Sequence, residues 1–164
     1  MQSPFSNPDH ANPAHWRASA APDGSPGTSD REPLNSWLTA HNLAPGEELT
    51  DRDLDGLAAI MEYALGTNPD DPSHLGALTT PIQSITVDQH TADYLVLRFP
   101  RRNGADDVLL EAEFSVDLIT WIKAGPVVSF SPTTDPAVEM VGIRAPLPLE
   151  NGPQQFLRLR ATSK

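Results

Sequence analysis

The 164-residue sequence contains no cysteine. This absence excludes a disulfide framework, thiolate zinc sites and a cysteine nucleophile. The sequence also lacks any apolar run near the roughly 18 residues that a membrane-spanning helix needs. Polar Gln2 and Ser3 follow Met1, where an export leader would have a basic and then an apolar region. We therefore expect no membrane insertion, and we place any export signal upstream of this chain.

Basic residues are scarce as well, because 11 lysines and arginines face 22 aspartates and glutamates, for a net charge of −11. The imbalance lies in residues 1–72, which carry 12 acidic and 3 basic residues, whereas residues 73–164 carry 10 and 8. A chain with no basic stripe repels phosphate backbones, so nucleic acid and anionic membranes are poor partners. A multivalent cation suits the acidic N-terminal half better.

Aromatic residues make up only 6% of the chain, whereas prolines number 17. This composition favours turns and extended segments, so we expect one ordered part and one loose part. Prolines and glycines interrupt residues 1–30 too often for a helix or a long strand, and we interpret that stretch as disordered or extended. Apolar side chains recur at helical spacing in 34–43, after Pro33, and in 57–65, before Gly66. We predict a short helix in each of these two ranges.

One stretch of the acidic half, residues 51–62, reads DRDLDGLAAIME. It matches the calcium-loop template, which has acids at positions 1, 3 and 5, glycine at 6 and glutamate at 12. Calcium takes six to eight oxygen ligands, which alternate acids in an extended loop can supply from one side. Gly56 permits the sharp turn that the loop needs. The predicted ligands are the carboxylates of Asp51, Asp53, Asp55 and Glu62 and the backbone carbonyl of Leu57.

This loop departs from a complete EF-hand in two ways. Position nine is Ala59, so a water molecule should take that place, and Pro45 and Gly46 leave no room for a long entering helix. We expect weak affinity, about 10⁻⁵ to 10⁻³ M, suited to extracellular calcium. A merely solvated acidic helix start would explain the aspartates but not Gly56 and Glu62 in register. Three further residues offer side-chain oxygens, and we interpret them either as turn residues or as additional calcium ligands: Asn68, Asp70 and Asp71.

From Ile82 onward the apolar period changes to two, as in half-buried antiparallel strands. Short strands at this spacing indicate an antiparallel β-sandwich. We predict a mainly β fold in which two short helices flanking the EF-hand-like calcium loop precede the sandwich. The three parts are residues 1–30, the helical calcium-binding segment 31–72 and the sandwich 78–162. The predicted strands are 82–88, 94–99, 108–116, 119–123, 126–131, 137–144 and 154–161.

Three parts of the sequence resemble the C-terminal region of secreted bacterial proteins with lamin-tail domains. The motifs NPAHWRAS (12–19) and GSPG (24–27) resemble the end of a lamin-tail domain, which is a β-sandwich. Residues 51–69, which end in EYALGTNP, resemble a calcium segment related to thrombospondin type 3 repeats. The resemblance implies a C-terminal piece of an exported protein, extracellular or on the cell surface. The third resemblance is to a C-terminal β module of such proteins, and it rests on YLVLRFPRR (94–102), SVDLITW (115–121) and FLRLR (156–160).

No pattern indicates catalysis, because no serine sits in a glycine-flanked elbow and no phosphate-binding glycine loop occurs. The five histidines are scattered, and we interpret His90, between Asp88 and Asp93, as part of a turn. Glu111 and Glu113 share one face of a strand, and their alternation with apolar residues indicates a solvent face rather than a catalytic pair. We predict that this chain is not an enzyme.

We therefore predict a non-catalytic calcium-binding accessory module of an exported bacterial protein, with a spacer, adhesion or surface-association role. Two other binding roles stay open. Tyr94, Arg98 and Trp121 would form a platform for a carbohydrate, unless Trp121 plugs the end of the sandwich after a turn begun by Asp117. Alternatively, edge strands such as 154–161 pair with a protein partner in a sorting or adhesive tail.

Overall fold

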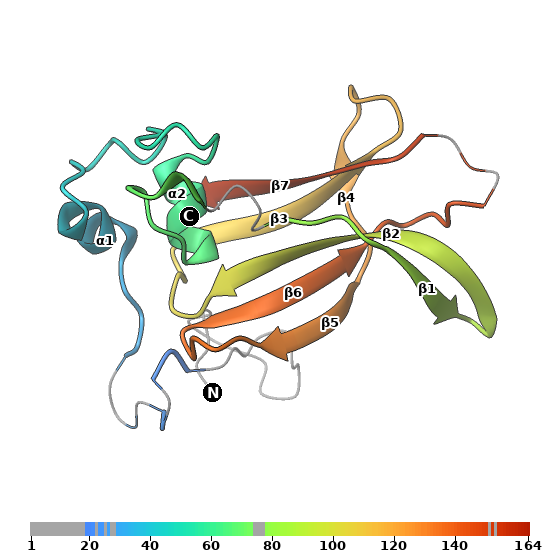
Figure 1. The fold of residues 1–164 in the computed structure, drawn as a ribbon, viewed down its shortest axis with the longest axis horizontal. Coiled ribbons are helices and arrows are strands. Elements are labelled where there is room, and N and C mark those ends of the chain that lie inside the picture. Colours follow the sequence, from blue (N-terminus) through green and yellow to red (C-terminus); the bar gives the residue numbers. More distant parts are fainter. Residues whose placement is uncertain are drawn as a thin grey trace.

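The computed structural model is mainly antiparallel β, with two short helices and two sheets, which confirms the predicted fold class (Figure 1). Most of the stretch 1–30 that we interpreted as disordered or extended lies outside the described residues, and so does most of NPAHWRAS. Within the described part of the chain, no helix is long and apolar enough to cross a bilayer. The structure describes residues 19–21, 23–24, 26, 29–73, 78–150, 152 and 154–164.

The strands form two sheets that pack face to face. One sheet has four strands in the order β1-β2-β6-β5, and the other has three in the order β4-β3-β7. Every pairing is antiparallel. The strands are β1 (Ile82–Val87), β2 (His90–Arg102), β3 (Val108–Ser115), β4 (Ile122–Lys123), β5 (Val127–Pro132), β6 (Val138–Arg144) and β7 (Phe156–Ser163).

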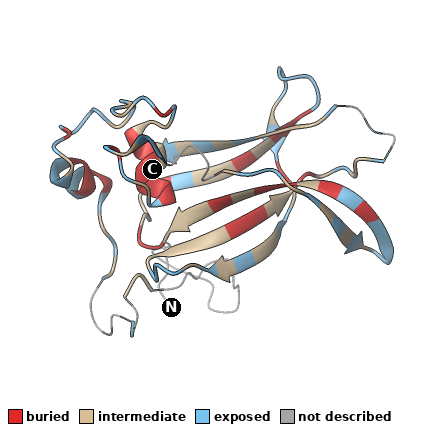
Figure 2. Cartoon of the chain, viewed as in Figure 1, coloured by how far each residue is buried: buried red, intermediate tan, exposed pale blue. Residues whose placement is uncertain are grey.

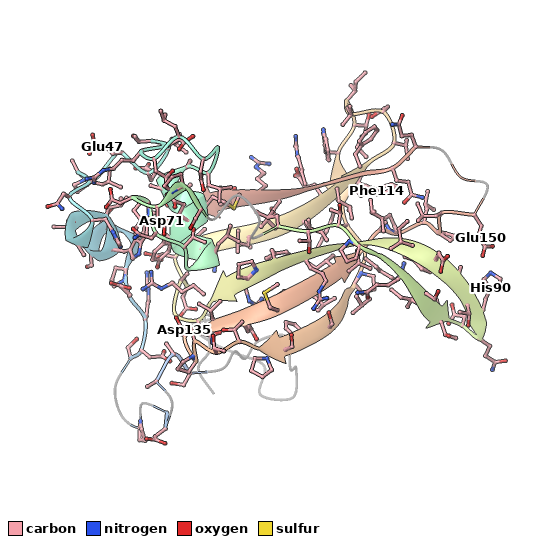
Figure 3. The ribbon with its side chains drawn as sticks, in the orientation of Figure 1. Glu47, Asp71, His90, Phe114, Asp135 and Glu150 are labelled. Carbon is pink, nitrogen blue, oxygen red and sulfur yellow. The ribbon has the colours of Figure 1, made fainter. Side chains whose placement is uncertain are left out.

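Strand β2 is the longest, and it is not half-buried as we predicted. Its first half pairs with β1 in a hairpin whose tip carries His90, and its second half pairs with β6 (Figure 3). Leu97 faces the sandwich core, yet Tyr94 and Val96 on the other face are 6% and 0% exposed. The Arg144 guanidinium, on the neighbouring strand, lies 4.7 Å from the centre of the Tyr94 ring and helps to cover it. The strict alternation of buried and solvated residues therefore fails here.

Both helices are shorter than predicted. Helix α1 (Leu34–Ala40) follows Pro33, and helix α2 (Ala59–Leu65) begins two residues later than expected. Gly66 ends α2 with φ of 78°, the left-handed cap that the sequence predicted. A Cβ atom at Gly66 would lie 2.8 Å from the Val138 side chain, so β6 also limits this position to glycine.

Helix α2 belongs to two apolar clusters at once. The helical cluster joins α1 to one side of α2, and α2 contributes Ile60, Tyr63 and Ala64 to it. The sandwich cluster lies between the sheets, and α2 contributes the fully buried Leu65. Figure 2 shows α2 buried along its length between α1 and the sheets. A change in the position or stability of α2 should therefore affect both apolar clusters.

A polar junction fixes α2 and α1 to the turn between β2 and β3. The Tyr63 hydroxyl donates to Asp107 Oδ1 at 2.6 Å, and the Leu34 backbone N–H, at the start of α1, donates to Asp107 Oδ2 at 2.8 Å. Burial raises the pKa of Asp107, but these hydrogen bonds and the charge of Arg31 outweigh it and leave that pKa below its usual value. Asp107 thus stays ionised and caps the helix.

Candidate metal centre

The three predicted aspartates converge just before α2. One carboxylate oxygen from each of Asp51, Asp53 and Asp55 lies within 4.8 Å of the others, so these residues form a cluster that could hold a metal ion. Each aspartate also uses one of its carboxylate oxygens to shape the loop. Asp51 accepts from the Gly56 N–H at 3.0 Å, and Asp55 accepts from the Leu57 N–H at 2.8 Å. Asp53 accepts from the Asp55 N–H at 3.2 Å. Each aspartate thus keeps a second oxygen that these hydrogen bonds within the loop do not use.

Those remaining oxygens are buried and lack hydrogen-bond partners. A buried carboxylate oxygen without a partner is costly, because it has lost water and gained nothing in return. Four such oxygens close together in the sequence are the donors that a cation-binding site would present. They are Asp51 Oδ1, Asp53 Oδ2, Asp55 Oδ2 and Glu62 Oε2, one from each predicted carboxylate ligand.

Glu62 is the most constrained member of the set. It is the fourth residue of α2, and its side chain is fully buried. Burial, followed by the negative charges of Asp53 and Asp55, raises the pKa of Glu62 to about 7. The Thr67 hydroxyl donates to Glu62 Oε1 at 3.5 Å, a contact that the loop template did not predict. Without a cation, this carboxyl group is poised to take up a proton.

The backbone of the loop adopts the strained turns that such a site needs. Gly56 has φ of 93°, as its place in the template predicted, and Leu54 has φ of 64°, which is unusual for a branched apolar residue. The base of the loop is closed by two backbone hydrogen bonds, Ala59 N–H to the Thr50 carbonyl at 2.9 Å and Ile60 N–H to the Glu48 carbonyl at 2.8 Å. Leu54 is 84% exposed, so the chain holds it outward while the acids turn inward.

Arg52 ties the loop to its surroundings where an entering helix would stand in an EF-hand. Its guanidinium donates to the His41 carbonyl, just after α1, and forms an ion pair with Asp70 at 2.9 Å.

Two side-chain oxygens that follow α2 accept hydrogen bonds within turns. Asn68 Oδ1 accepts from the Asp70 N–H at 3.2 Å, and Asp71 Oδ1 accepts from the Ser73 N–H at 3.1 Å. Glu47 and Asp71 lie at the same helical end of the molecule (Figure 3). The structure therefore favours the turn interpretation for Asn68 and Asp71, and it places the Asp70 carboxylate in the ion pair with Arg52.

The other candidate residues do not gather into a second site among the described residues. Glu113 forms ion pairs with Arg158 at 2.7 Å and Arg160 at 3.7 Å, which occupies its carboxylate. Arg158 also lies 3.9 Å from the centre of the Trp121 ring. Because Tyr94 is buried in the other sheet, the predicted carbohydrate platform is not formed.

The turn predicted at Asp117 is present. Asp117 Oδ1 accepts from the Ile119 and Thr120 N–H groups at 2.9 and 2.7 Å.

No protein-family model, curated protein or solved structure matches this chain. The resemblance to secreted lamin-tail-domain proteins therefore stays a prediction.

Proposed function

We propose that this chain is a non-catalytic calcium-binding module. The observation that supports the proposal is the set of four buried carboxylate oxygens without partners, one from each of Asp51, Asp53, Asp55 and Glu62. The Glu62 carboxylate is not part of the three-aspartate cluster, but the charges of these aspartates act on it. A divalent cation bound among the four carboxylates would replace their mutual repulsion with attraction. The Leu57 carbonyl and a water molecule beside Ala59 would complete the ligand shell, as the loop template predicts.

The donor set favours calcium over other common metal ions. All of its donors are oxygens, and carboxylate and carbonyl oxygens suit hard cations rather than zinc or copper. Magnesium demands a near-ideal octahedron and gives up its waters reluctantly, whereas calcium accepts irregular shells of six to eight oxygens. An incomplete loop whose fourth carboxylate stands on a helix would fit such an irregular shell.

The ion would act through α2. Glu62 would bind the ion, and the next residue, Tyr63, reaches Asp107 at the turn between β2 and β3. Leu65, one turn of helix away, is buried in the sandwich core. Bound calcium would therefore hold the helical segment rigidly against the sandwich, as a spacer or surface-association module of an exported protein requires. The extracellular setting follows from the expected weak affinity and from the sequence resemblance.

A calcium titration of the whole chain tests the proposal. With a Kd of about 10⁻⁴ M, 10 mM calcium should stabilise the fold by about 2.7 kcal/mol. That is a rise in Tm of about 5–10 °C for a chain of this size. Asp53→Ala should abolish both the binding heat in calorimetry and the rise in Tm. Magnesium at 10 mM is the control and should give a much smaller rise. Absence of binding heat together with an unchanged Tm in 10 mM calcium would refute the proposal.

Calcium affinity and calcium-free stability should respond to pH in opposite directions. Because the pKa of Glu62 is raised from 4.5 to about 7 in the folded chain, the folded state holds a proton that the unfolded state releases between these values. The calcium-free protein should therefore gain of order 2 kcal/mol of stability as the pH falls from about 7.5 to 5. Calcium binding should weaken over the same range, because this proton must leave first. Denaturant titrations and calorimetry at both pH values check the two trends.

A further inference from the structure

One side of strand β3 is left largely uncovered. Strand β4 has only two residues, which pair with Glu113 and Phe114 (Figure 1). The Ala124 N–H extends this pairing by one bond, to the Ala112 carbonyl at 2.8 Å. In an antiparallel sheet, backbone groups of alternate residues point to the same side. Leu110 therefore points its N–H and C=O toward the same side as Ala112, where no other described backbone group meets them.

The uncovered stretch of β3 borders a cavity of about 200 Å³ that enters the sandwich core. Leu110 itself is only partly buried, which is consistent with an open position beside it. Lys123, Arg101 and Glu111 stand among the polar groups that line the cavity. The apolar part of the lining comes from both sheets and includes Phe99, Leu110, Ala112, Val127, Val141 and Ile143.

We propose that this groove receives an extended strand of a partner polypeptide. The incoming strand would lie antiparallel to β3, in line with β4, and would pair with the Leu110 backbone. Its residue opposite Leu110 would share the inward face and place an apolar side chain in the cavity. A small apolar molecule would fill the cavity but would leave the Leu110 N–H and C=O unpaired. The unpaired backbone is thus what selects a polypeptide.

Charge at the groove indicates the chemistry of the partner strand. Lys123 forms no ion pair with any described residue, whereas Arg101 is already paired with Glu139. A carboxylate near the amino-terminal end of the incoming strand would therefore meet Lys123. A second copy of this chain fits less well, because its edge strand β7 would bring Arg158 and Arg160 toward Lys123. Of the two six-residue edge strands of the other sheet, β5 carries a register shift and ends at Pro132, and β1 contains no carboxylate that could meet Lys123.

Synthetic eight-residue peptides that alternate threonine with valine, leucine or phenylalanine, with one glutamate at the amino-terminal end, provide the probe. The whole chain is titrated, and hydrogen exchange of the Leu110 amide is followed by NMR. We expect at least one peptide to bind with a Kd below about 1 mM and to slow exchange at Leu110 by about tenfold or more. N-methylation of the peptide amides that face β3 should abolish binding. Lys123→Glu should weaken it.

A matched pair of variants locates the site. Val127 lines the groove, and Val116 lies outside it, yet the two are 42% and 41% exposed. Val127→Trp should fill the groove and weaken peptide binding by about tenfold. Val116→Trp should leave the affinity within about twofold of the original.

Four outcomes would overturn the proposal. The first is that no peptide of the set binds at 1 mM. The second is equal binding of the N-methylated peptides, which would indicate an apolar ligand. The third is protection of the Leu157 and Leu159 amides instead of Leu110, which would place the strand on β7. The fourth is protection of Leu110 in a concentration-dependent dimer without peptide, which would make a second copy the occupant.

Discussion

Glu62→Gln should raise the Tm of the calcium-free protein and at the same time remove its response to calcium. The glutamine keeps the size of the side chain and its place on α2, but it carries no charge. In the calcium-free state, the substitution removes a buried carboxylate that faces Asp51, Asp53 and Asp55. The gain should be about 1–2 kcal/mol at pH 7.5, or about 3–6 °C in Tm. In 10 mM calcium, the same variant should melt below the original protein, because it lacks the carboxylate that would bind the ion.

A variant with a higher Tm without calcium and a lower Tm with calcium distinguishes a metal ligand from an ordinary acidic residue. Glu48→Gln is the matched control, since Glu48 lies in the same acidic segment and its carboxylate is not among the four buried oxygens. It should change the Tm by no more than about 2 °C with or without calcium. If Glu62→Gln instead lowered the calcium-free Tm and kept the calcium response, Glu62 would be a structural residue and the metal centre would be wrong.

The acidic loop was predictable because the residues that define it lie close together in the sequence. Alternate acids, Gly56 and Glu62 lie within twelve consecutive positions, and the turn at Gly56 and the convergence of Asp51, Asp53 and Asp55 follow from that spacing. The Gly66 cap and most strand positions were predictable for the same reason. The metal and its identity stay predictions, because the geometry provides oxygen donors but does not name the ion.

Features that depend on distant residues could not be predicted. Tyr94 was expected on a solvated face, but Arg144, fifty residues away, covers it. Asp107 carried no recognisable motif, yet it meets both Tyr63 and the start of α1. The shortness of β4 results from the turn at Asp117, which takes up residues predicted to be strand. In each case the deciding contact joins elements whose pairing no local pattern specifies.

Alanine at either of two buried leucines should destabilise the entire chain by a similar amount. Leu38 lies in the helical cluster and Leu65 in the sandwich cluster, and both are 0% exposed. Replacing either by alanine leaves a cavity and should cost about 3 kcal/mol, or about 6–12 °C in Tm. Because α2 contributes to both clusters, we expect one cooperative transition in each variant, measured by calorimetry and by circular dichroism. Leu49→Ala, at a leucine that is 76% exposed, should change stability by less than about 0.5 kcal/mol.

The number of transitions decides how calcium could act on the sandwich. If Leu38→Ala melted in two steps, with the strand signal unaffected by the first, the helical segment would be a separate unit and α2 would not couple the clusters. A single step would instead mean that energy gained at Glu62 stabilises every strand, because α2 cannot loosen without exposing Leu65 to water. In that case calcium should raise the Tm of both alanine variants by as much as that of the original protein, since neither leucine contributes to the loop.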